Sequence, residues 1–336
     1  LHAGSAQIAD TVDDDEGHRI VDGEEEQDAE HDGGKASAHA APLLLAELVG
    51  QRLGDGKGQH SVQHAQHTGD SLNFNVMLYG REESEHFFRI RVNNGNGMVN
   101  FGPNVRYTDD LDEALAFSDW IFISVGAQDF RELMDGMSAR ETKGKVLVLC
   151  MKGLEKGTGL RLSQIAGQYA PKATPAVWLG PGHVQEFVKG NPNCMVIDSA
   201  EPAVKKELAA ALSGKLIRMY YGDDLIGNEV GAAAKNVIGI AAGMLDGIGG
   251  DSMKGALMAR GAREVSRLIK AMGGNEMTAY GLCHLGDYEA TLFSPHSHNR
   301  SFGEAFARAQ AQGSGTELDM LRKGRHNIGL AEGVNT

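Results

Sequence analysis

Lys235 is the residue whose surroundings point most directly to chemistry. It interrupts residues 226–245, an apolar stretch rich in glycine and alanine that predicts a closely packed, buried helix. A lysine on such a helix can extend its stem and place the ammonium group in water. Alternatively, an ammonium group that faces a binding site acquires a lowered pKa and can donate a proton. The sequence leaves both interpretations open.

Two later clusters contain groups that could bind a charged ligand. Residues 284–287 (His-Leu-Gly-Asp) place Asp287 in a glycine-containing turn, and residues 297–300 (Ser-His-Asn-Arg) gather several hydrogen-bond donors. Those donors would suit a phosphate-bearing ligand. A turn acid more often serves as a cap, however, and the four polar residues would equally suit the start of an exposed helix. Each cluster alone is therefore a weak signal.

The elements that must position these groups alternate between strands and helices. Apolar runs predict strands at residues 75–79, 105–107, 120–125, 145–150, 176–179 and 215–220. Helices are expected from Asp110 onward and at residues 130–137, 162–169 and 202–213. The alternation predicts an α/β fold: a doubly wound, Rossmann-type parallel sheet, incomplete at its first strand, followed by an all-helical second domain. We expect an acidic segment at residues 1–74, a partial dinucleotide-binding domain at 75–221 and a helical substrate and catalytic domain at 222–336.

Ligands of such sheets bind beyond the carboxyl ends of the strands. The predicted ends are residues 80–81, 125–127, 151–153 and 180–182, and three of the four are rich in glycine. Glycine lets the backbone approach a phosphate or a sugar closely. Lys152 follows one strand end directly, and we favour a ligand-binding role for it over that of a solvated loop lysine.

The glycine fingerprint of a dinucleotide-binding sheet is absent from its expected place. That fingerprint is a strand, then GxGxxG, then a helix whose first turn binds the pyrophosphate. Residues 54–58 (GDGKG) have the wrong spacing and follow no predicted strand, and Asn100 stands where Gly95 and Gly97 would need a third glycine. The fingerprint should lie about 20–30 residues before Asn75, within a segment of different composition.

Residues 1–74 form that segment, with 15 acidic and 4 basic side chains and seven of the 13 histidines. Its acidic runs repel themselves, which predicts disorder. We consider three interpretations: a solvated acidic tail, a metal-binding tail, or a sequence-level accident such as translation in the wrong frame. Its one apolar run, residues 42–49, is too short to form a core alone.

The overall composition excludes several classes of protein. A net charge of −13 disfavours a nucleic-acid partner, which would require a basic face. Three cysteines without metal-ligand spacing predict free thiols, no metal site and a cytoplasmic location. No apolar run approaches the ~18 residues of a membrane span, and the sequence opens without a signal-peptide pattern.

Six motifs together resemble the bacterial-type NAD(P)-dependent glycerol-3-phosphate dehydrogenases. They are residues 79–81 (YGR), 151–155 (MKGLE), 180–183 (GPGH), 234–237 (AKNV), 285–287 (LGD) and 298–300 (HNR). The resemblance extends from about Asn75 to Thr336. It implies NAD(P)H-dependent reduction of dihydroxyacetone phosphate, a triose phosphate, to sn-glycerol 3-phosphate for phospholipid synthesis. A homodimer is left open as the assembly.

The resemblance also implies a role for individual positions. Lys235 corresponds to the catalytic acid and base. The substrate-binding positions are Lys152, Gly180, Gly182, Asp287, Ser297, His298 and Asn299. The cofactor-binding positions are Arg81, Lys152, Val184, His298 and Glu332. Arg81 stands where an acidic residue would favour NAD, so NADP is the expected cofactor and NAD the alternative.

The sequence departs from the family pattern at several points. Gly182 and His183 replace a serine and a phenylalanine, and His298 replaces an arginine by a side chain that is mostly neutral at pH 7. Arg300 is expected to compensate in part. The sequence also stops before the C-terminal helices of the family. Two rival interpretations follow: another two-domain reductase of the ketopantoate or hydroxyacid type, or a non-enzymatic remnant unable to bind dinucleotide.

Overall fold

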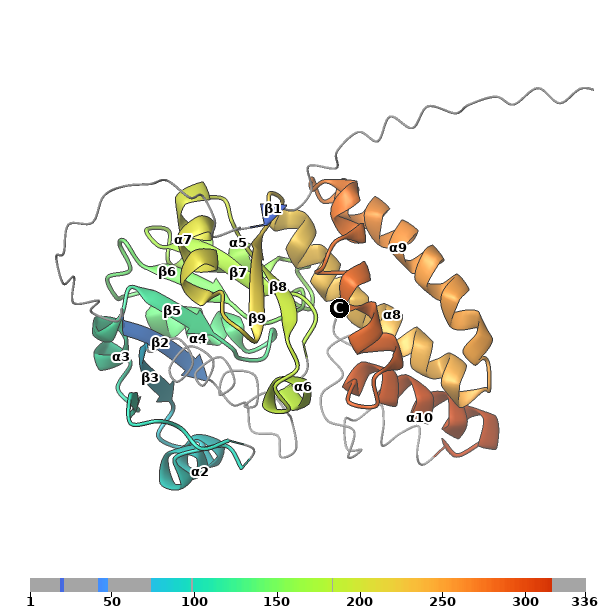
Figure 1. Cartoon of the computed structure of the whole chain (residues 1–336), viewed down its shortest axis with the longest axis horizontal. Coiled ribbons are helices and arrows are strands. Elements are labelled where there is room, and N and C mark those ends of the chain that lie inside the picture. Colours follow the sequence, from blue (N-terminus) through green and yellow to red (C-terminus); the bar gives the residue numbers. More distant parts are fainter. Residues whose placement is uncertain (1–18, 21–41, 48–73, 98, 183, 316–336) are drawn as a thin grey trace, which may run out of the picture.

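The computed structural model describes residues 19–20, 42–47, 74–97, 99–182 and 184–315 (Figure 1). A sheet with its covering helices forms one half of the molecule, and a group of helices forms the other (Figure 1). This agrees with the predicted fold class. The predicted boundary between residues 221 and 222 stays a prediction, although a long helix does begin shortly after it, at Leu225.

The described strands form one sheet in the order β1-β9-β8-β7-β6-β5-β2-β3-β4. Strands β7, β6, β5, β2, β3 and β4 are parallel, whereas β8 runs antiparallel to β7 and β1 runs antiparallel to β9. The strands are β1 (Arg19–Ile20), β2 (Pro42–Glu47), β3 (Asn75–Gly80), β4 (Val105–Thr108), β5 (Trp120–Ile123), β6 (Val146–Leu149), β7 (Thr174–Leu179), β8 (Asn193–Ser199) and β9 (Ile217–Tyr221).

The prediction that the sheet lacks its first strand is wrong. Strand β2 lies between β3 and β5 and pairs in parallel with both, with Leu43 opposite Val76 on one side and Trp120 on the other. Without it, β3 and β5 would leave their backbone N–H and C=O groups unpaired in the middle of a sheet. The apolar run at residues 42–47 fills that position. It is therefore part of the larger sheet and does not have to form a hydrophobic core by itself.

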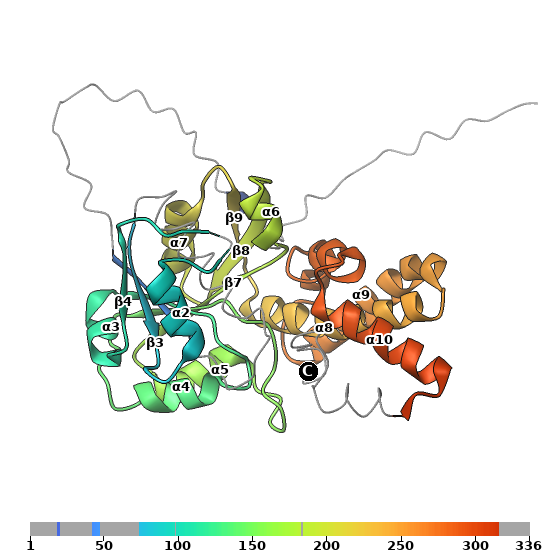
Figure 2. The same ribbon diagram turned by 90° about the horizontal axis from the view of Figure 1, so that it is seen from below.

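Helices cover both faces of the sheet (Figure 2). Successive residues of the central strands point to opposite faces, so Ile121 and Ile123 pack with α3, α4 and α5, whereas Phe122 packs on the side of α7. Burial on both faces explains the nearly continuous apolar runs in the sequence. The helices are α2 (Glu85–Asn93), α3 (Leu111–Phe117), α4 (Phe130–Met137), α5 (Leu162–Tyr169), α6 (Val184–Val188) and α7 (Pro202–Leu212).

The second half is built around α8 (Leu225–Gly247), with α9 (Lys254–Ala271) and α10 (His298–Gln312) packed beside it (Figure 1). Small residues allow α8 and α10 to cross closely. A Cβ atom at Gly243 would overlap the carbonyl oxygen of Arg300, and one at Gly303 would overlap that of Ile240. Short helical turns connect α9 to α10: η3 (Glu276–Tyr280), η4 (Leu285–Asp287) and η5 (Glu289–Phe293), with η2 (Asp251–Met253) before α9.

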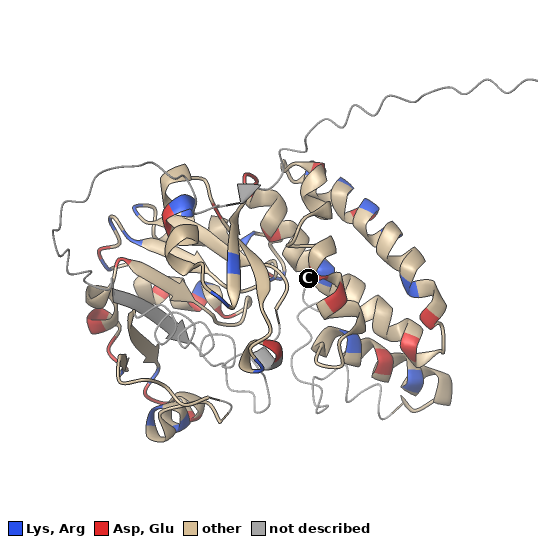
Figure 3. Cartoon of the chain, in the orientation of Figure 1, with Lys and Arg blue, Asp and Glu red and all other residues tan. Residues whose placement is uncertain are grey.

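The surface of the helical half contains both signs of charge. Lys and Arg predominate along α9, whereas α10 carries both signs of charge (Figure 3). Several of these residues form i,i+4 pairs, such as Arg308 with Glu304. Within the described residues, no helix is both long enough and apolar enough to cross a bilayer.

Candidate active site

Lys235 lies inside the helical half and not at its surface. Only 6% of the residue is exposed, so the interpretation in which its stem reaches water is wrong. Its Nζ donates a hydrogen bond to Thr291 Oγ1 at 2.7 Å and forms an ion pair with Asp287 Oδ2. The α8 helix therefore places one ammonium group against the turns η4 and η5.

Lys152 brings a second ammonium group to the same carboxylate from the sheet half. It follows β6, as predicted, and its Nζ lies 2.7 Å from Asp287 Oδ2 and 2.9 Å from the carbonyl oxygen of Gly180. Gly180 follows β7 with φ +125°, a conformation that glycine adopts readily. The carboxylate of Asp287 thus joins two lysines from the two halves of the molecule.

Burial and the neighbouring charges shift the pKa values of Lys235 and Asp287. Burial lowers the pKa of Lys235 to about 7, with Lys152 contributing in the same direction and Asp287 opposing it. Burial also works against ionisation of Asp287, but the two ammonium groups outweigh it and hold the pKa of that carboxyl below its ordinary value. The site therefore contains an ionised carboxylate beside a lysine that exchanges its proton near neutral pH.

Glycine residues on α8 let other segments approach Lys235. Gly239 lies one helical turn after it, and a Cβ atom there would be 2.7 Å from Thr291 Cγ2 and 3.3 Å from Asn299 Cβ. Asn299, near the start of α10, is therefore packed beside the turn of α8 that follows the lysine.

The remaining residues of the 297–300 cluster serve the start of α10. Ser297 is buried and caps this helix, since its Oγ accepts the backbone N–H of Arg300 at 3.3 Å. His298 is the first residue of the helix. The expectation that Arg300 compensates for the missing family arginine is not supported, because its guanidinium already binds Asp246 at 2.7 Å and Glu304 at 2.8 Å.

Gly182, after β7, stands in a crowded place. A Cβ atom there would lie 2.9 Å from the ring of Phe187 in α6, so this chain has little room for the serine that the family pattern has. Val184 begins α6, but its side chain lies outside the described part of the chain. Glu332 and the expected glycine loop before Asn75 also lie outside the described residues.

Arg81 directly follows β3, away from Lys152 and Lys235. Its Nη1 lies 3.2 Å from Glu132 and its Nε 3.6 Å from Glu83. In sheet order, β3 and β6 are three strand spacings apart, which is about 14 Å. Arg81 and Lys152 therefore mark two ends of one stretch of the carboxyl edge of the sheet.

This edge fits an extended dinucleotide. The parallel strands β2, β3, β5 and β6 end there together, as nucleotide-binding sheets require. Lys152 and the bare backbone of Gly180 lie at the end of this edge that is beside Lys235. Arg81 lies at the other end of this edge, just after β3.

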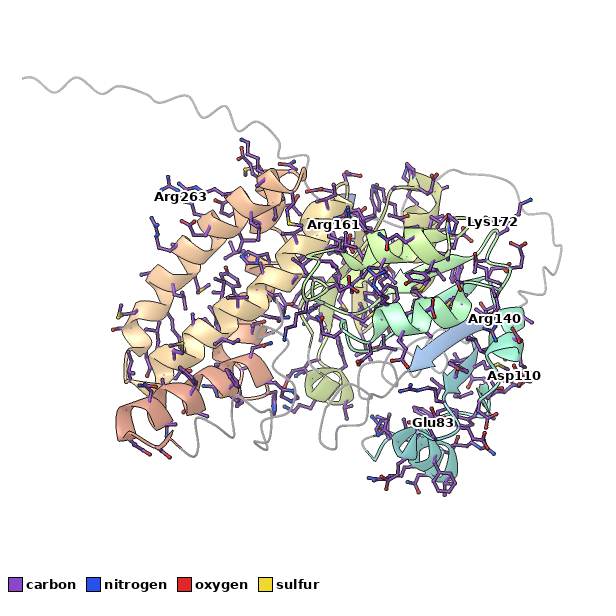
Figure 4. All side chains as sticks on the ribbon, turned by 180° about the vertical axis from the view of Figure 1, so that it is seen from behind. Glu83, Asp110, Arg140, Arg161, Lys172 and Arg263 are labelled. Carbon is purple, nitrogen blue, oxygen red and sulfur yellow. The ribbon has the colours of Figure 1, made fainter. Side chains whose placement is uncertain are left out.

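The sequence interpretation missed Thr291 and a second buried carboxylate. Thr291 follows Asp287 by four residues, so a helical turn places both on one side; that spacing could have revealed it. Glu229 of α8 accepts hydrogen bonds from the Ser163 N–H at 2.9 Å and from Arg161 Nη1 at 2.5 Å. Arg161 lies where the sheet half meets α8 (Figure 4) and stands directly before α5. The hydrogen bonds of Glu229 therefore connect α8 to the start of α5.

Two family models match the chain. Residues 56–205 match the N-terminus of NAD-dependent glycerol-3-phosphate dehydrogenase, and residues 224–336 match its C-terminus. The first match begins upstream of Asn75, so the likeness starts earlier than the sequence motifs indicated.

Individual relatives of the chain are enzymes of the same family. The NAD(P)+ glycerol-3-phosphate dehydrogenase of Pelodictyon phaeoclathratiforme is 35% identical over 234 residues, 68% of this chain and 70% of the relative. The same enzyme of Parvibaculum lavamentivorans is 37% identical over 266 residues, 78% of this chain and 77% of the relative. The crystal structure of glycerol-3-phosphate dehydrogenase from Coxiella burnetii superposes with a TM-score of 0.75 at 25% identity, covering 88% of this chain and 86% of that one. The chain therefore belongs to the family of NAD(P)-dependent glycerol-3-phosphate dehydrogenases.

Proposed function

We propose that the chain interconverts dihydroxyacetone phosphate and sn-glycerol 3-phosphate with NAD(P), using Lys235 as the proton donor and acceptor. The observation that carries this proposal is the buried ammonium group of Lys235, paired with Asp287 and joined through it to Lys152. Family membership supports the reaction and the cofactor, and the geometry of the ion pair supports the role of Lys235.

Reduction of the ketone needs a hydride at carbon and a proton at oxygen. The reduced nicotinamide supplies the hydride when the cofactor is bound. Lys235 donates the proton to the oxygen as negative charge develops on it, and its positive charge stabilises that oxygen. With a pKa of about 7, the lysine can give up its proton and regain it near neutral pH. Thr291 accepts one N–H of the ammonium group and so limits its orientation.

The other residues bind and orient the substrate. Asp287, held between the two lysines, accepts hydrogen bonds from the substrate hydroxyls, and Lys152 touches both substrate and cofactor. Ser297, His298 and Asn299 receive the phosphate at the start of α10, where helix N-terminal N–H groups favour an anion. Gly180 and Gly182 border the substrate on the sheet side.

The cofactor contacts are proposed for Arg81, Lys152, Val184, His298 and Glu332. Arg81 favours NADP over NAD, because a guanidinium at the end of β3 can pair with a 2′-phosphate. A phosphate there would compete with Glu83 and Glu132 for the guanidinium. A cytoplasmic location is part of the proposal and is supported by the free thiols of Cys150, Cys194 and Cys283. A homodimer stays a prediction.

The test is a spectrophotometric assay of the purified chain with NADPH or NADH. We expect oxidation of the cofactor with dihydroxyacetone phosphate and none with ketopantoate or with dihydroxyacetone, which lacks the phosphate. Lys235→Met should lower kcat by about 10²–10⁴-fold, the usual contribution of general acid catalysis. Lys270→Met is the matched control, because Lys270 is exposed and pairs with Glu276 on the surface.

Two results would count against the proposal. Turnover by Lys235→Met at the level of the control would remove the assigned role of the lysine. A wild-type chain that neither turns over nor enhances NADPH fluorescence on titration would support the non-enzymatic remnant.

A further inference from the structure

His284 and Tyr288 form a buried hydrogen-bonded pair that the proposed mechanism does not use. Both residues are completely buried. The Tyr288 hydroxyl lies 2.6 Å from His284 Nε2, and the two rings meet edge to face with centroids 4.7 Å apart. The other ring nitrogen, Nδ1, lies 2.9 Å from the carbonyl oxygen of Gly231.

The partners determine which nitrogen of His284 holds the proton. A carbonyl oxygen only accepts hydrogen bonds, so Nδ1 must be the donor to Gly231. Burial lowers the pKa of His284 to about 4, so the ring is neutral at pH 7. Nε2 is then an acceptor, and the Tyr288 hydroxyl donates to it.

The oxygen that His284 binds belongs to the turn of α8 that contains Lys235. In an α-helix the carbonyl of residue i accepts the N–H of residue i+4, so Gly231 is also the helical partner of the Lys235 backbone N–H. Gly231 makes this approach feasible, because a Cβ atom there would lie only 3.2 Å from His284 Cβ.

The backbone of His284 holds the other member of the ion pair. Its carbonyl oxygen accepts the Asp287 N–H at 3.1 Å and so shapes the turn η4. Tyr288, next to Asp287, reaches toward α9, where a Cβ atom at Gly261 would lie 2.9 Å from its hydroxyl oxygen. His284 is thus hydrogen-bonded both to the turn of α8 that contains Lys235 and to the turn η4 that contains Asp287. Its partner Tyr288 packs against α9.

We propose that the His284–Tyr288 pair is a positioning device that sets the Lys235–Asp287 ion pair for catalysis without touching the substrate. This inference rests on the proposed role of Lys235 and extends it to the residues that hold the lysine in place. This role differs from ordinary core packing, because loss of the His284–Tyr288 hydrogen bond should alter the Lys235–Asp287 ion pair as well as the stability of the fold.

Three variants test the pair with graded losses. His284→Leu removes both ring hydrogen bonds, Tyr288→Phe removes only the hydroxyl, and His284→Asn keeps a short side-chain donor for Gly231. Tyr107→Phe is the matched control, since it removes a tyrosine hydroxyl that donates to Asn94 in the sheet half.

The first measurement is the pH profile of kcat and KM for dihydroxyacetone phosphate reduction. We expect His284→Leu to lower kcat by up to about 10²-fold, the effect of misplacing a catalytic group by about 1 Å, with KM little changed. The basic limb of kcat should move to lower pH, because a displaced Asp287 supports the ammonium form of Lys235 less. His284→Asn should recover part of kcat, and Tyr107→Phe should resemble the wild type. The proposal would be overturned if the His284 and Tyr288 variants were less stable but kept the kcat of the wild type and the same basic limb in its pH profile.

The second measurement, amide hydrogen exchange, does not require activity. In His284→Leu or Tyr288→Phe we expect faster exchange in peptides spanning residues 229–239 and 283–291, and unchanged exchange in the strand at 174–179. If the wild type reduces no substrate but these peptides respond, the proposed function fails while the structural coupling stands. If the two peptides exchange no faster than in Tyr107→Phe, the positioning role is wrong. Should His284→Leu fail to fold, the other two variants decide the question.

Discussion

Replacing Lys235 should remove a pH dependence of folding stability that the buried ammonium group creates. Burial lowers the pKa of Lys235 from 10.5 to about 7 in the folded chain, whereas the unfolded chain keeps the ordinary value. Between these two pH values the unfolded state binds a proton that the folded state has released. The free energy of unfolding therefore rises with pH across this window, and the stabilisation is lost as the pH falls toward 7.

The size of the effect follows from the distance between the two pKa values. At 1.36 kcal/mol per pH unit, the gap between about 7 and 10.5 corresponds to roughly 5 kcal/mol. About 2 kcal/mol of this falls between pH 7 and pH 9, where urea unfolding is practical. Asp287 does not titrate in that range, because the neighbouring lysines hold its pKa below the ordinary carboxyl value.

The assay compares urea unfolding of the wild type, Lys235→Met and Lys270→Met at pH 7, 8 and 9. Methionine has a similar length to lysine and packs flexibly, so it fills the same space without a charge. All other titrating groups are common to the three proteins, so only differences between their pH slopes matter. The wild type and Lys270→Met should gain about 2 kcal/mol more than Lys235→Met over this range. Parallel profiles for the wild type and Lys235→Met would refute the reasoning that the ammonium group is buried at a cost.

Two further perturbations test how α8 is held in place. Glu229→Ala should lower the free energy of unfolding by roughly 3 kcal/mol in urea titrations, because it leaves the largely buried Arg161 without its carboxylate. A loss below ~0.5 kcal/mol would show that the ion pair between Glu229 and Arg161 contributes little to stability. Gly243→Ala should lower the melting temperature, because a Cβ atom there overlaps the backbone of α10. Gly255→Ala on α9, where a Cβ atom meets nothing within 4 Å, should leave the melting temperature unchanged or raise it. Equal melting temperatures for the two glycine variants would contradict the close crossing of α8 and α10.

Much of the sheet could be predicted because its strands are buried on both faces. The runs at residues 120–125 and 145–150 became β5 and β6, and the helix expected at residues 130–137 became α4 with the same bounds. Local periodicity is sufficient for elements of this kind. Strand β8 was missed, and α2 and α6 lacked a recognisable pattern. The role of residues 42–47 was missed for another reason: whether an apolar run becomes a strand depends on partners that lie elsewhere in the chain.

Within the site, the sequence indicated several of the right residues but few of their contacts. Lys235, Lys152 and Asp287 were named in advance, and the structure brings them together with Gly180. The partnership of Arg300 with Asp246 was not predicted, and neither was the hydrogen bond from Lys235 to Thr291. Such contacts depend on the direction of side chains after helices have packed, which residue spacing along one segment does not specify.

The sequence by itself determined the strand–helix alternation, the small residues of α8 and the presence of one lysine among them, because periodicity and side-chain size are local properties. Tertiary structure decided that this lysine is buried and paired. Lys152 and Asp287 are 135 positions apart, and their ammonium and carboxylate groups meet only because the sheet and the helices pack against each other. The lowered pKa of Lys235 depends on that packing, since loss of water and the nearness of other charges exist only in the folded molecule.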